Sequence, residues 1–403
     1  MSTSLLYQAF GVRGYEYCAT RYTRGQVVFE MRPQEDQVRC SRCGGRNGTR
    51  QGTVFRVFRT VPIGRKRVGL GLEVPRMECR DCKVVRQIHL GFADPRVRYT
   101  RTFARYALDL SRHMTIQDVA NHLGISWDVI KEIQRESLQR RFRKPRLRGL
   151  RLIAIDEISI GHGHRYLTVV LDLESGAAVF VGDGKGADAL EPFWRRLRAS
   201  RAKVRAVAMD MSPAYIDAVS RRLPKAAIIF DHFHIVKLFN DKLSDFRRAL
   251  YHDATAAQKK VLKGSRWLLL KNPENLDKAH HEKERLREAL KLNEPLATAY
   301  YMKEDLRQIW SQGTKPKAAL FLKDWCARAE ASRIPMLVKF AHTLGAHRYG
   351  ILAWYDYPIS TGPLEGTNNK IRTMQRQAYG FRDTEFFKLK IYALHETKHV
   401  LVG

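Results

Sequence analysis

Residues 152–157 read Leu-Ile-Ala-Ile-Asp-Glu, an apolar run that ends on two carboxylates. A short apolar run bounded by polar residues is typical of a buried β-strand. The pattern returns twice downstream, where the apolar segments 204–209 and 226–230 end on Asp210 and Asp231. Apolar strands that finish on acids are informative, because a buried negative charge is costly unless something compensates it.

The segments between these runs predict the topology. Two more strands and two helices are expected at 165–173, 177–181, 186–198 and from Pro213 onward. Three hairpin-linked strands, a helix, a strand, a helix and a strand is the element order of an α/β RNase H-like fold. The first and fourth strands lie side by side in that fold, so we expect Asp156 and Asp210 to lie a few Å apart. Side chains alternate along a strand, so only one of Asp156 and Glu157 points to the site, and we favour Asp156.

A cation shared between the two acids would offset the cost of burying them. Mg²⁺ prefers oxygen ligands and uses few carboxylates together with substrate phosphates. Two such ions, with Mn²⁺ as an expected substitute, activate water or a 3′-hydroxyl and stabilise the leaving oxygen at a phosphodiester. The sequence therefore predicts a magnesium site at Asp156 and Asp210 that acts on a nucleic acid.

A third acid is expected in segment 360–370, which reads Ser-Thr-Gly-Pro-Leu-Glu-Gly-Thr-Asn-Asn-Lys. Pro363 suits the first position of a helix, which puts Glu365 in the first turn. Glu365 is a candidate third magnesium ligand, or else a glutamate that only stabilises the helix dipole. Spacing alone leaves both readings open. The same helix carries cations suited to a phosphate backbone, namely Lys370, Arg372 and Arg376.

Two C-x-x-C pairs near the N-terminus predict a zinc site. Four thiolates come from Cys40, Cys43, Cys79 and Cys82. Zinc binds four soft ligands in a tetrahedron, and each pair supplies one edge. Strand patterns at 25–31, 53–59 and 67–74 indicate an enlarged zinc ribbon with a structural ion. The alternative is four buried cysteines without a metal.

A helix-turn-helix is expected next. Thr115 to Asp118 forms a capping box, Gly124 lies in the turn, and a second helix runs from Trp127 to about Leu138. In a DNA-binding unit of this kind the second helix enters the major groove. The predicted groove-facing and phosphate-facing residues are Trp127, Lys131, Gln134, Arg135 and Arg141, followed by Arg143 and Lys144 in a basic linker. The alternative is an ordinary helical hairpin.

Composition favours a polyanion as the partner. The chain has 72 Lys and Arg against 41 Asp and Glu, a net charge of +31 in 403 residues. Such a charge says little about fold but favours nucleic acid over other partners. We find no apolar run long enough to span a bilayer and no secretory signal, so a cytoplasmic protein is expected. Trp267, Trp310 and Trp325 are expected to pack in a helical core; the alternative is that one of them stacks on an unpaired base at the cleaved end.

The predicted domains follow the chain in order. They are a zinc ribbon at 1–98, a helix-turn-helix and linker at 99–148, the first part of the catalytic core at 149–240, a helical insertion at 241–345, and the last part of the core with the third acid at 346–403.

Four motifs together resemble the DDE transposases of bacterial insertion sequences, most closely the ISL-three family. These motifs lie at residues 156–159, 210–215, 231–234 and 362–370. The order of ribbon, helix-turn-helix and RNase H-like domain also matches that family over nearly the whole chain. The resemblance implies that Asp156, Asp210 and Glu365 are the catalytic triad, and that Asp231 and His234 form an accessory pair. It implies that the helical residues after this pair are an all-α insertion domain.

The resemblance implies a DNA transposase that binds the terminal inverted repeats of its element as a dimer or larger assembly. It would cleave each end with Mg²⁺ and join the freed 3′-hydroxyl to target DNA, on the bacterial nucleoid. One alternative is a sequence-specific DNA-binding regulator or domesticated protein whose RNase H-like domain is not catalytic. Another is a structure-specific nuclease of the same fold.

Overall fold

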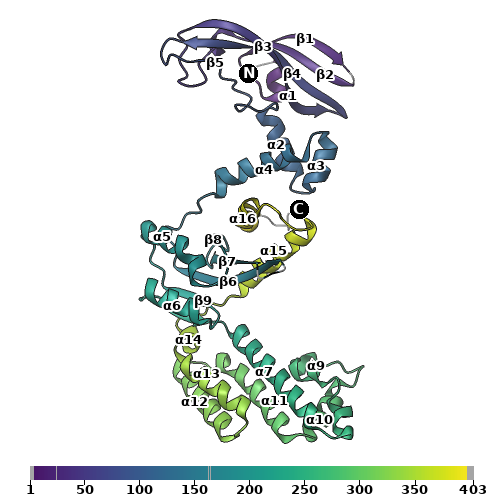
Figure 1. The fold of residues 1–403 in the computed structure, drawn as a ribbon, viewed down its shortest axis with the longest axis vertical. Helices are drawn as coiled ribbons and strands as arrows, with labels where there is room; N and C mark the ends of the chain where they lie inside the picture. Colours follow the sequence, from purple (N-terminus) through teal and green to yellow (C-terminus); the bar gives the residue numbers. More distant parts are fainter. Residues whose placement is uncertain (1–3, 24, 162, 164, 397–403) are drawn as a thin grey trace. The chain divides into compact units, whose positions relative to one another are not determined.

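The computed structural model describes residues 4–23, 25–161, 163 and 165–396 (Figure 1). Its contacts divide the described chain into two compact units. The first holds residues up to 143 together with 374–386, and the second holds 144–373 together with the residues from 387. The predicted last part of the core, 346–403, is therefore not one continuous piece, because residues 374–386 belong to the first unit.

A five-stranded sheet forms most of the first unit. Its strands are β1 (Tyr15–Thr23), β2 (Gln26–Pro33), β3 (Gly48–Ile63), β4 (Lys66–Cys79) and β5 (Val85–Gln87). The order is β1-β2-β4-β3, with β5 paired to β4. The three predicted strands coincide with parts of β2, β3 and β4. The central strand β4 is buried along most of its length, and the short helix α1 (Leu5–Phe10) joins the same apolar core through Leu6 and Phe10.

Three helices follow the sheet within this unit: α2 (Arg101–Leu110), α3 (Ile116–Leu123) and α4 (Trp127–Phe142). The predicted cap is present, because the Thr115 hydroxyl accepts a hydrogen bond from the Asp118 N–H at 3.0 Å. Gly124 ends α3 with a φ of 62°, a left-handed conformation that glycine adopts without strain. Apolar residues of all three helices share one core, which Phe386 from the returning segment completes.

A second five-stranded sheet lies in the second unit. Its strands are β6 (Leu152–Gly161), β7 (Arg165–Asp172), β8 (Ala178–Asp183), β9 (Ala206–Met209) and β10 (Ala227–Phe230). The order is β10-β9-β6-β7-β8, with β9 parallel to both β6 and β10. The predicted contact between the first and fourth strands is confirmed. Strand β6 is longer than expected because its hairpin with β7 continues past Asp156, which pairs with Val169.

Helices make up the rest of the second unit. They are α5 (Glu191–Ser200), α6 (Pro213–Arg222), α7 (His232–Asp253), α8 (Ala256–Leu262), α9 (Ser265–Leu270), α10 (Glu282–Lys291), α11 (Glu294–Arg307), α12 (Lys315–Ala331), α13 (Pro335–Ala346), α14 (Arg348–Leu352), α15 (Gly362–Gln377) and α16 (Thr384–Ala393). Short 3-10 segments lie at η1 (Glu35–Gln37), η2 (Ala187–Leu190), η3 (Pro273–Asn275), η4 (Gln308–Ser311), η5 (Ala353–Tyr355) and η6 (Leu394–Glu396). The last four residues of α15 and the first three of α16 belong to the first unit.

The helices between α7 and α13 enclose an aromatic core. Helices α7, α11, α12 and α13 pack along one another (Figure 1). The ring of Phe340 lies edge-on to Phe239 and Trp325, with centroids 4.9 and 5.9 Å away. Trp325 is buried as predicted, and its indole N–H donates to the Met302 carbonyl at 2.9 Å. No helix formed by the described residues is both long and apolar enough to cross a membrane.

One tryptophan departs from the expected core packing. Trp310 is partly buried against the core, but Trp267 is 64% exposed. Helix α9 is only six residues long, and it buries Leu268 and Leu269 instead. The guanidinium of Arg266 lies 5.0 Å from the exposed ring of Trp267. The prediction that Trp267 packs in the core is therefore wrong, because a helix this short buries one side only.

Replacing either of two helical glycines by alanine should change the free energy of unfolding, in opposite directions at the two positions. A Cβ on Gly350 would lie 2.4 Å from a ring carbon of the buried Phe230, whereas a Cβ on Gly345 would meet nothing within 4 Å. We expect Gly350→Ala to destabilise the protein by about 1–3 kcal/mol through overpacking. Gly345→Ala should stabilise it by up to about 1 kcal/mol, because alanine favours a helix more than glycine does. Chemical denaturation of both variants measures this, and equal shifts would contradict the packing described.

Candidate functional site

Strand register brings Asp156 and Asp210 together. In the parallel pair β6 and β9, Ala154 lies opposite Ala208. Each acid follows its alanine by two residues, so both side chains leave the sheet on the same side and at the same level. The backbone N–H of Ser212 holds the Asp210 carboxylate at 3.0 Å. Two carboxylates from different strands therefore converge, as the sequence predicted.

The environment of Asp156 is short of positive charge. Burial raises the pKa of the Asp156 carboxyl to about 6, and the negative charges of Asp210 and Glu157 add to this rise. A hydrogen bond from the Glu157 backbone N–H and the charge of His234 act in the opposite direction. Oxygen donors in this setting fit a hard divalent cation, which would offset the repulsion.

Glu157 is engaged separately from Asp156. The Tyr215 hydroxyl, from α6, donates to the Glu157 carboxylate at 2.8 Å. The same hydroxyl lies 3.2 Å from Thr168 Oγ1 and accepts from the Gly186 N–H at 3.3 Å. Burial raises the pKa of Tyr215 and the Glu157 carboxylate adds to the rise, whereas the contacts with Thr168 and the Gly186 N–H act in the opposite direction. Neighbouring acids on one strand are thus held by different partners, in keeping with strand alternation.

The two residues predicted as an accessory pair, Asp231 and His234, lie near these acids. Asp231 follows β10 directly and is 2% exposed, and its Oδ2 accepts a hydrogen bond from the Thr361 hydroxyl. His234 is the third residue of α7, close enough for its charge to lower the pKa of Asp156. Asp231 therefore contacts a segment 130 residues away, and His234 acts on the Asp156 carboxylate.

Glu365 lies in the first turn of α15, as predicted, with an exposed side chain. Its helix is joined to the site through Asn368, whose amide N–H donates to Asp156 Oδ2 at 2.9 Å. Among the described residues, only the four cysteines bring three or more metal-ligating atoms within 4.8 Å of one another. The three carboxylates are therefore not gathered this tightly.

Sequence reasoning missed Asn368, Thr361 and Tyr215. A signal for Asn368 did exist, because it lies on an apolar helix stripe between Leu364 and Ile371. An amide at such a position must find a buried partner. Nothing in the sequence names that partner, since Asp156 lies more than two hundred residues earlier.

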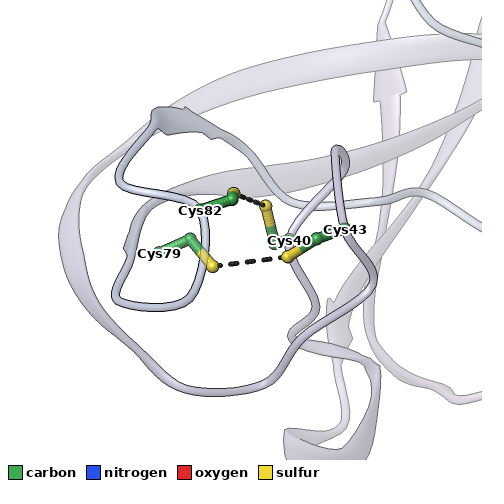
Figure 2. Close-up of side chains that lie close together, drawn as sticks. All are labelled: Cys40, Cys43, Cys79 and Cys82. Atoms are coloured by element: carbon green, nitrogen blue, oxygen red, sulfur yellow. Dashed lines mark hydrogen bonds between the residues drawn. The ribbon is translucent and has the colours of Figure 1, made fainter.

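The four predicted zinc ligands meet in the first unit (Figure 2). The sulfurs of Cys40 and Cys82 lie 3.6 Å apart, and those of Cys43 and Cys79 lie 3.5 Å apart. A tetrahedron with Zn–S bonds of about 2.3 Å has sulfurs about 3.8 Å apart. Backbone N–H groups, chiefly that of Cys43, lower the pKa of Cys40 to about 6, which favours its thiolate. The cluster fits one structural zinc ion.

Replacing one of the four cysteines should abolish zinc binding and lower the thermal stability of the first unit. We expect Cys79→Ser to lose the bound zinc and to unfold the first unit at lower temperature, because a structural zinc contributes directly to folding. Metal analysis and calorimetry measure both effects. Cys18→Ser is the matched control, since Cys18 is exposed on β1 and lies outside the cluster. Zinc retention by Cys79→Ser would contradict the assignment.

The predicted groove-facing residues of α4 differ in their exposure to solvent. Trp127 is 40% exposed, and the ammonium of Lys131 lies 5.2 Å from its ring centroid. Gln134 is only 7% exposed, so its predicted contact with a base edge is wrong for this conformation. The side chain is buried because α4 turns this face toward the helical core, next to Ile130 and Ile133.

Lys131 and Arg135 are held by an acid from the returning segment. Both pair with Asp383, with the Lys131 ammonium 3.0 Å from Oδ2. The other carboxylate oxygen accepts from the Phe386 N–H at 3.0 Å, near the start of α16. Burial alone would raise the pKa of Asp383, but this N–H and the two cations lower it. Neither cation is free for a phosphate in this conformation.

The remaining predicted DNA-contacting cations are exposed. They are Arg141 and Arg143 at the end of α4, Lys144 after it, and Lys370, Arg372 and Arg376 on α15. The Arg141 guanidinium lies 4.9 Å from the Phe142 ring centroid. All six side chains therefore reach the solvent.

Family models match successive parts of the chain. One described as a transposase matches residues 153–391, one described as the helix-turn-helix domain of transposase family ISL3 matches 88–137, and one described as the zinc-finger of transposase IS204/IS1001/IS1096/IS1165 matches 36–82. Together they bear out the ribbon, the helix-turn-helix and the transposase domain in the expected order.

Two curated relatives are similar along most of their length. The transposase for insertion sequence element IS1001 of Bordetella parapertussis is 32% identical over 369 residues, covering 90% of each chain. The transposase for insertion sequence element IS1557 of Mycobacterium tuberculosis is 31% identical over 388 residues, covering 89% of this chain and 86% of the relative. The chain therefore belongs to the ISL3 family of transposases, as its motifs indicated, and is a DNA transposase with a DNA-binding helix-turn-helix.

Proposed function

We propose that this transposase binds the terminal inverted repeats of its own insertion sequence, cleaves the DNA at each end and transfers the freed strand to target DNA. The observation that carries the proposal is the convergence of Asp156 and Asp210 from the parallel strands β6 and β9. Paired, partly buried carboxylates suit metal-dependent phosphodiester chemistry, and α15, the helix that carries Glu365, contacts Asp156 through Asn368.

The proposed site is an RNase H-like core interrupted by an all-α insertion at 241–345. Asp156, Asp210 and Glu365 would hold two Mg²⁺ ions, which Mn²⁺ could replace. Such ions polarise the attacking oxygen and stabilise the leaving oxygen. The protein's own contribution is positioning: Ser212 orients Asp210, and Asn368 orients Asp156. Asp231 and His234 serve as the accessory pair, the first through Thr361 and the second through its charge on Asp156.

End recognition is assigned to the first unit and the cations that follow it. The proposed contacts are Trp127, Lys131, Arg135, Arg141, Arg143, Lys144, Lys370, Arg372 and Arg376. Lys131 and Arg135 would have to exchange the Asp383 carboxylate for a DNA phosphate. Because two element ends must be joined, we propose a dimer or larger assembly on DNA. A protein with this function works on the bacterial nucleoid, in the cytoplasm.

Replacing Asp156 should separate catalysis from binding. We expect Asp156→Asn to lower metal-dependent cleavage of end DNA by at least about a hundredfold, because metal-based charge stabilisation is worth several kcal/mol. Binding to the same DNA in a gel-shift assay should stay within about twofold. Asp183→Asn is the control, since Asp183 is an exposed acid at the end of β8, paired with Lys388. Normal cutting by Asp156→Asn would refute the assignment, and a wild-type protein that binds ends without cutting would favour a regulator.

Binding should weaken steeply with salt, because phosphate contacts release counterions. We expect Arg372→Ala to lower the slope of log affinity against log salt by about one, as one lost phosphate contact would. Lys291→Ala, a cation on α10 outside the proposed contact set, should leave the slope unchanged. Titrations of end DNA at several salt concentrations measure both slopes. A flat response of the wild-type protein would contradict the electrostatic part of the proposal.

A further inference from the structure

Helix α15 begins on a buried polar contact. The Thr361 hydroxyl donates to Oδ2 of Asp231, and the two residues are 1% and 2% exposed. Among the described residues, Oδ1 of Asp231 has no hydrogen bond, and the His232 Nδ1 lies 3.5 Å from it. The Thr361 contact therefore accounts for most of the hydrogen bonding of a buried carboxylate, which makes it costly to break.

The same threonine sets the backbone of Glu365. The first helical hydrogen bond of α15 runs from the Glu365 N–H to the Thr361 carbonyl at 2.8 Å. One backbone hydrogen bond therefore joins Glu365 to Thr361, and the Thr361 side chain is hydrogen-bonded to Asp231, the residue after β10. A shift of Thr361 would carry the first turn of the helix, and Glu365 with it.

A second polar contact lies about two helical turns beyond Thr361. Asn368 is 3% exposed and donates to Asp156 Oδ2 at 2.9 Å. Residues three apart lie on neighbouring positions of a helix face, so Asn368 follows Glu365 along one side of α15. Both contacts end on acids of the sheet, one after β10 and one on β6.

Apolar packing alone would leave the orientation of this helix loosely specified. Leu364 and Ile371 are fully buried and form the apolar stripe of α15 in the second unit. Such contacts are non-directional, so they resist sliding and rotation of a helix only weakly compared with hydrogen bonds of fixed geometry. Glu365 lies beside the stripe and is exposed, so burial does not fix the position of its side chain.

We propose that Thr361 and Asn368 are positioning residues that lock α15 against Asp231 and Asp156 and thereby aim Glu365 at the cation site. The inference rests on the proposed function and deepens it. It gives Asp231 a role as the anchor of the helix that carries the third acid. It also gives Asp156 two roles, as a cation ligand through one oxygen and as the partner of Asn368 through the other.

The test uses the full-length protein with two disruptive variants and two controls. Thr361→Val removes the hydroxyl at nearly constant volume, and Asn368→Leu does the same for the amide. Thr361→Ser keeps the hydroxyl and should restore wild-type behaviour. Thr367→Val is the matched control, because its hydroxyl bonds only to the Pro363 carbonyl of the same helix.

Two measurements are made on each variant. In single-turnover cleavage of end DNA, both disruptive variants should need at least about tenfold more Mn²⁺ for half-maximal rate, with end binding in the absence of metal unchanged. In hydrogen exchange of the metal-free protein, amides of residues 362–373 should exchange at least about tenfold faster. A merely structural role would lower the unfolding temperature without moving the Mn²⁺ requirement.

The outcomes separate the two proposals. Wild-type exchange and Mn²⁺ dependence in both folded variants would overturn the positioning role while leaving the proposed function intact. If no divalent cation supports cleavage of end DNA by the wild-type protein, the proposed function is refuted. Hydrogen exchange of the variants would still test the positioning role in that case. Should Thr361→Val fail to fold, Asn368→Leu carries the same test. Fast exchange in Thr361→Ser would also count against the proposal.

Discussion

The cost of burying negative charge at β6 and β9 constrains the whole second unit. Two apolar strands place Asp156 and Asp210 side by side, where burial raises the pKa of Asp156 and mutual repulsion adds to it. The protein compensates only in part, with an amide N–H from α15, a backbone N–H and the charge of His234. A divalent cation would offset the remaining repulsion between the two acids.

The first unit meets a different constraint. Its central strand β4 is buried along most of its length, and the loops before β3 and after β4 meet at the four cysteines. Four cysteines hold these loops together, with sulfur separations that suit one zinc ion. Domains with small cores commonly use a metal in this way, because metal binding replaces the free energy that a larger core would provide.

The segment from α15 to α16 serves both units. Its first part carries Glu365, Asn368 and the contact to Asp156, whereas residues 374–386 belong to the first unit. There Asp383 pairs with Lys131 and Arg135, and Phe386 completes the helical core. A single boundary in the sequence cannot describe this arrangement, because the chain leaves the second unit and returns to it within thirteen residues.

The sequence by itself determined the candidate zinc ligands, the helix-turn-helix and the order of elements along the chain, from which the proximity of Asp156 to Asp210 was predicted. Each depends on local spacing or on the periodicity of apolar residues, which a chain carries wherever it folds. Only the tertiary structure decided that Gln134 is buried and that Trp267 is exposed. It also decided that Asp383 forms ion pairs with Lys131 and Arg135 of α4. It also decided which partners Asn368 and Thr361 find. Those contacts join residues more than one hundred positions apart, and their geometry depends on how whole elements pack, for which local sequence holds no signal.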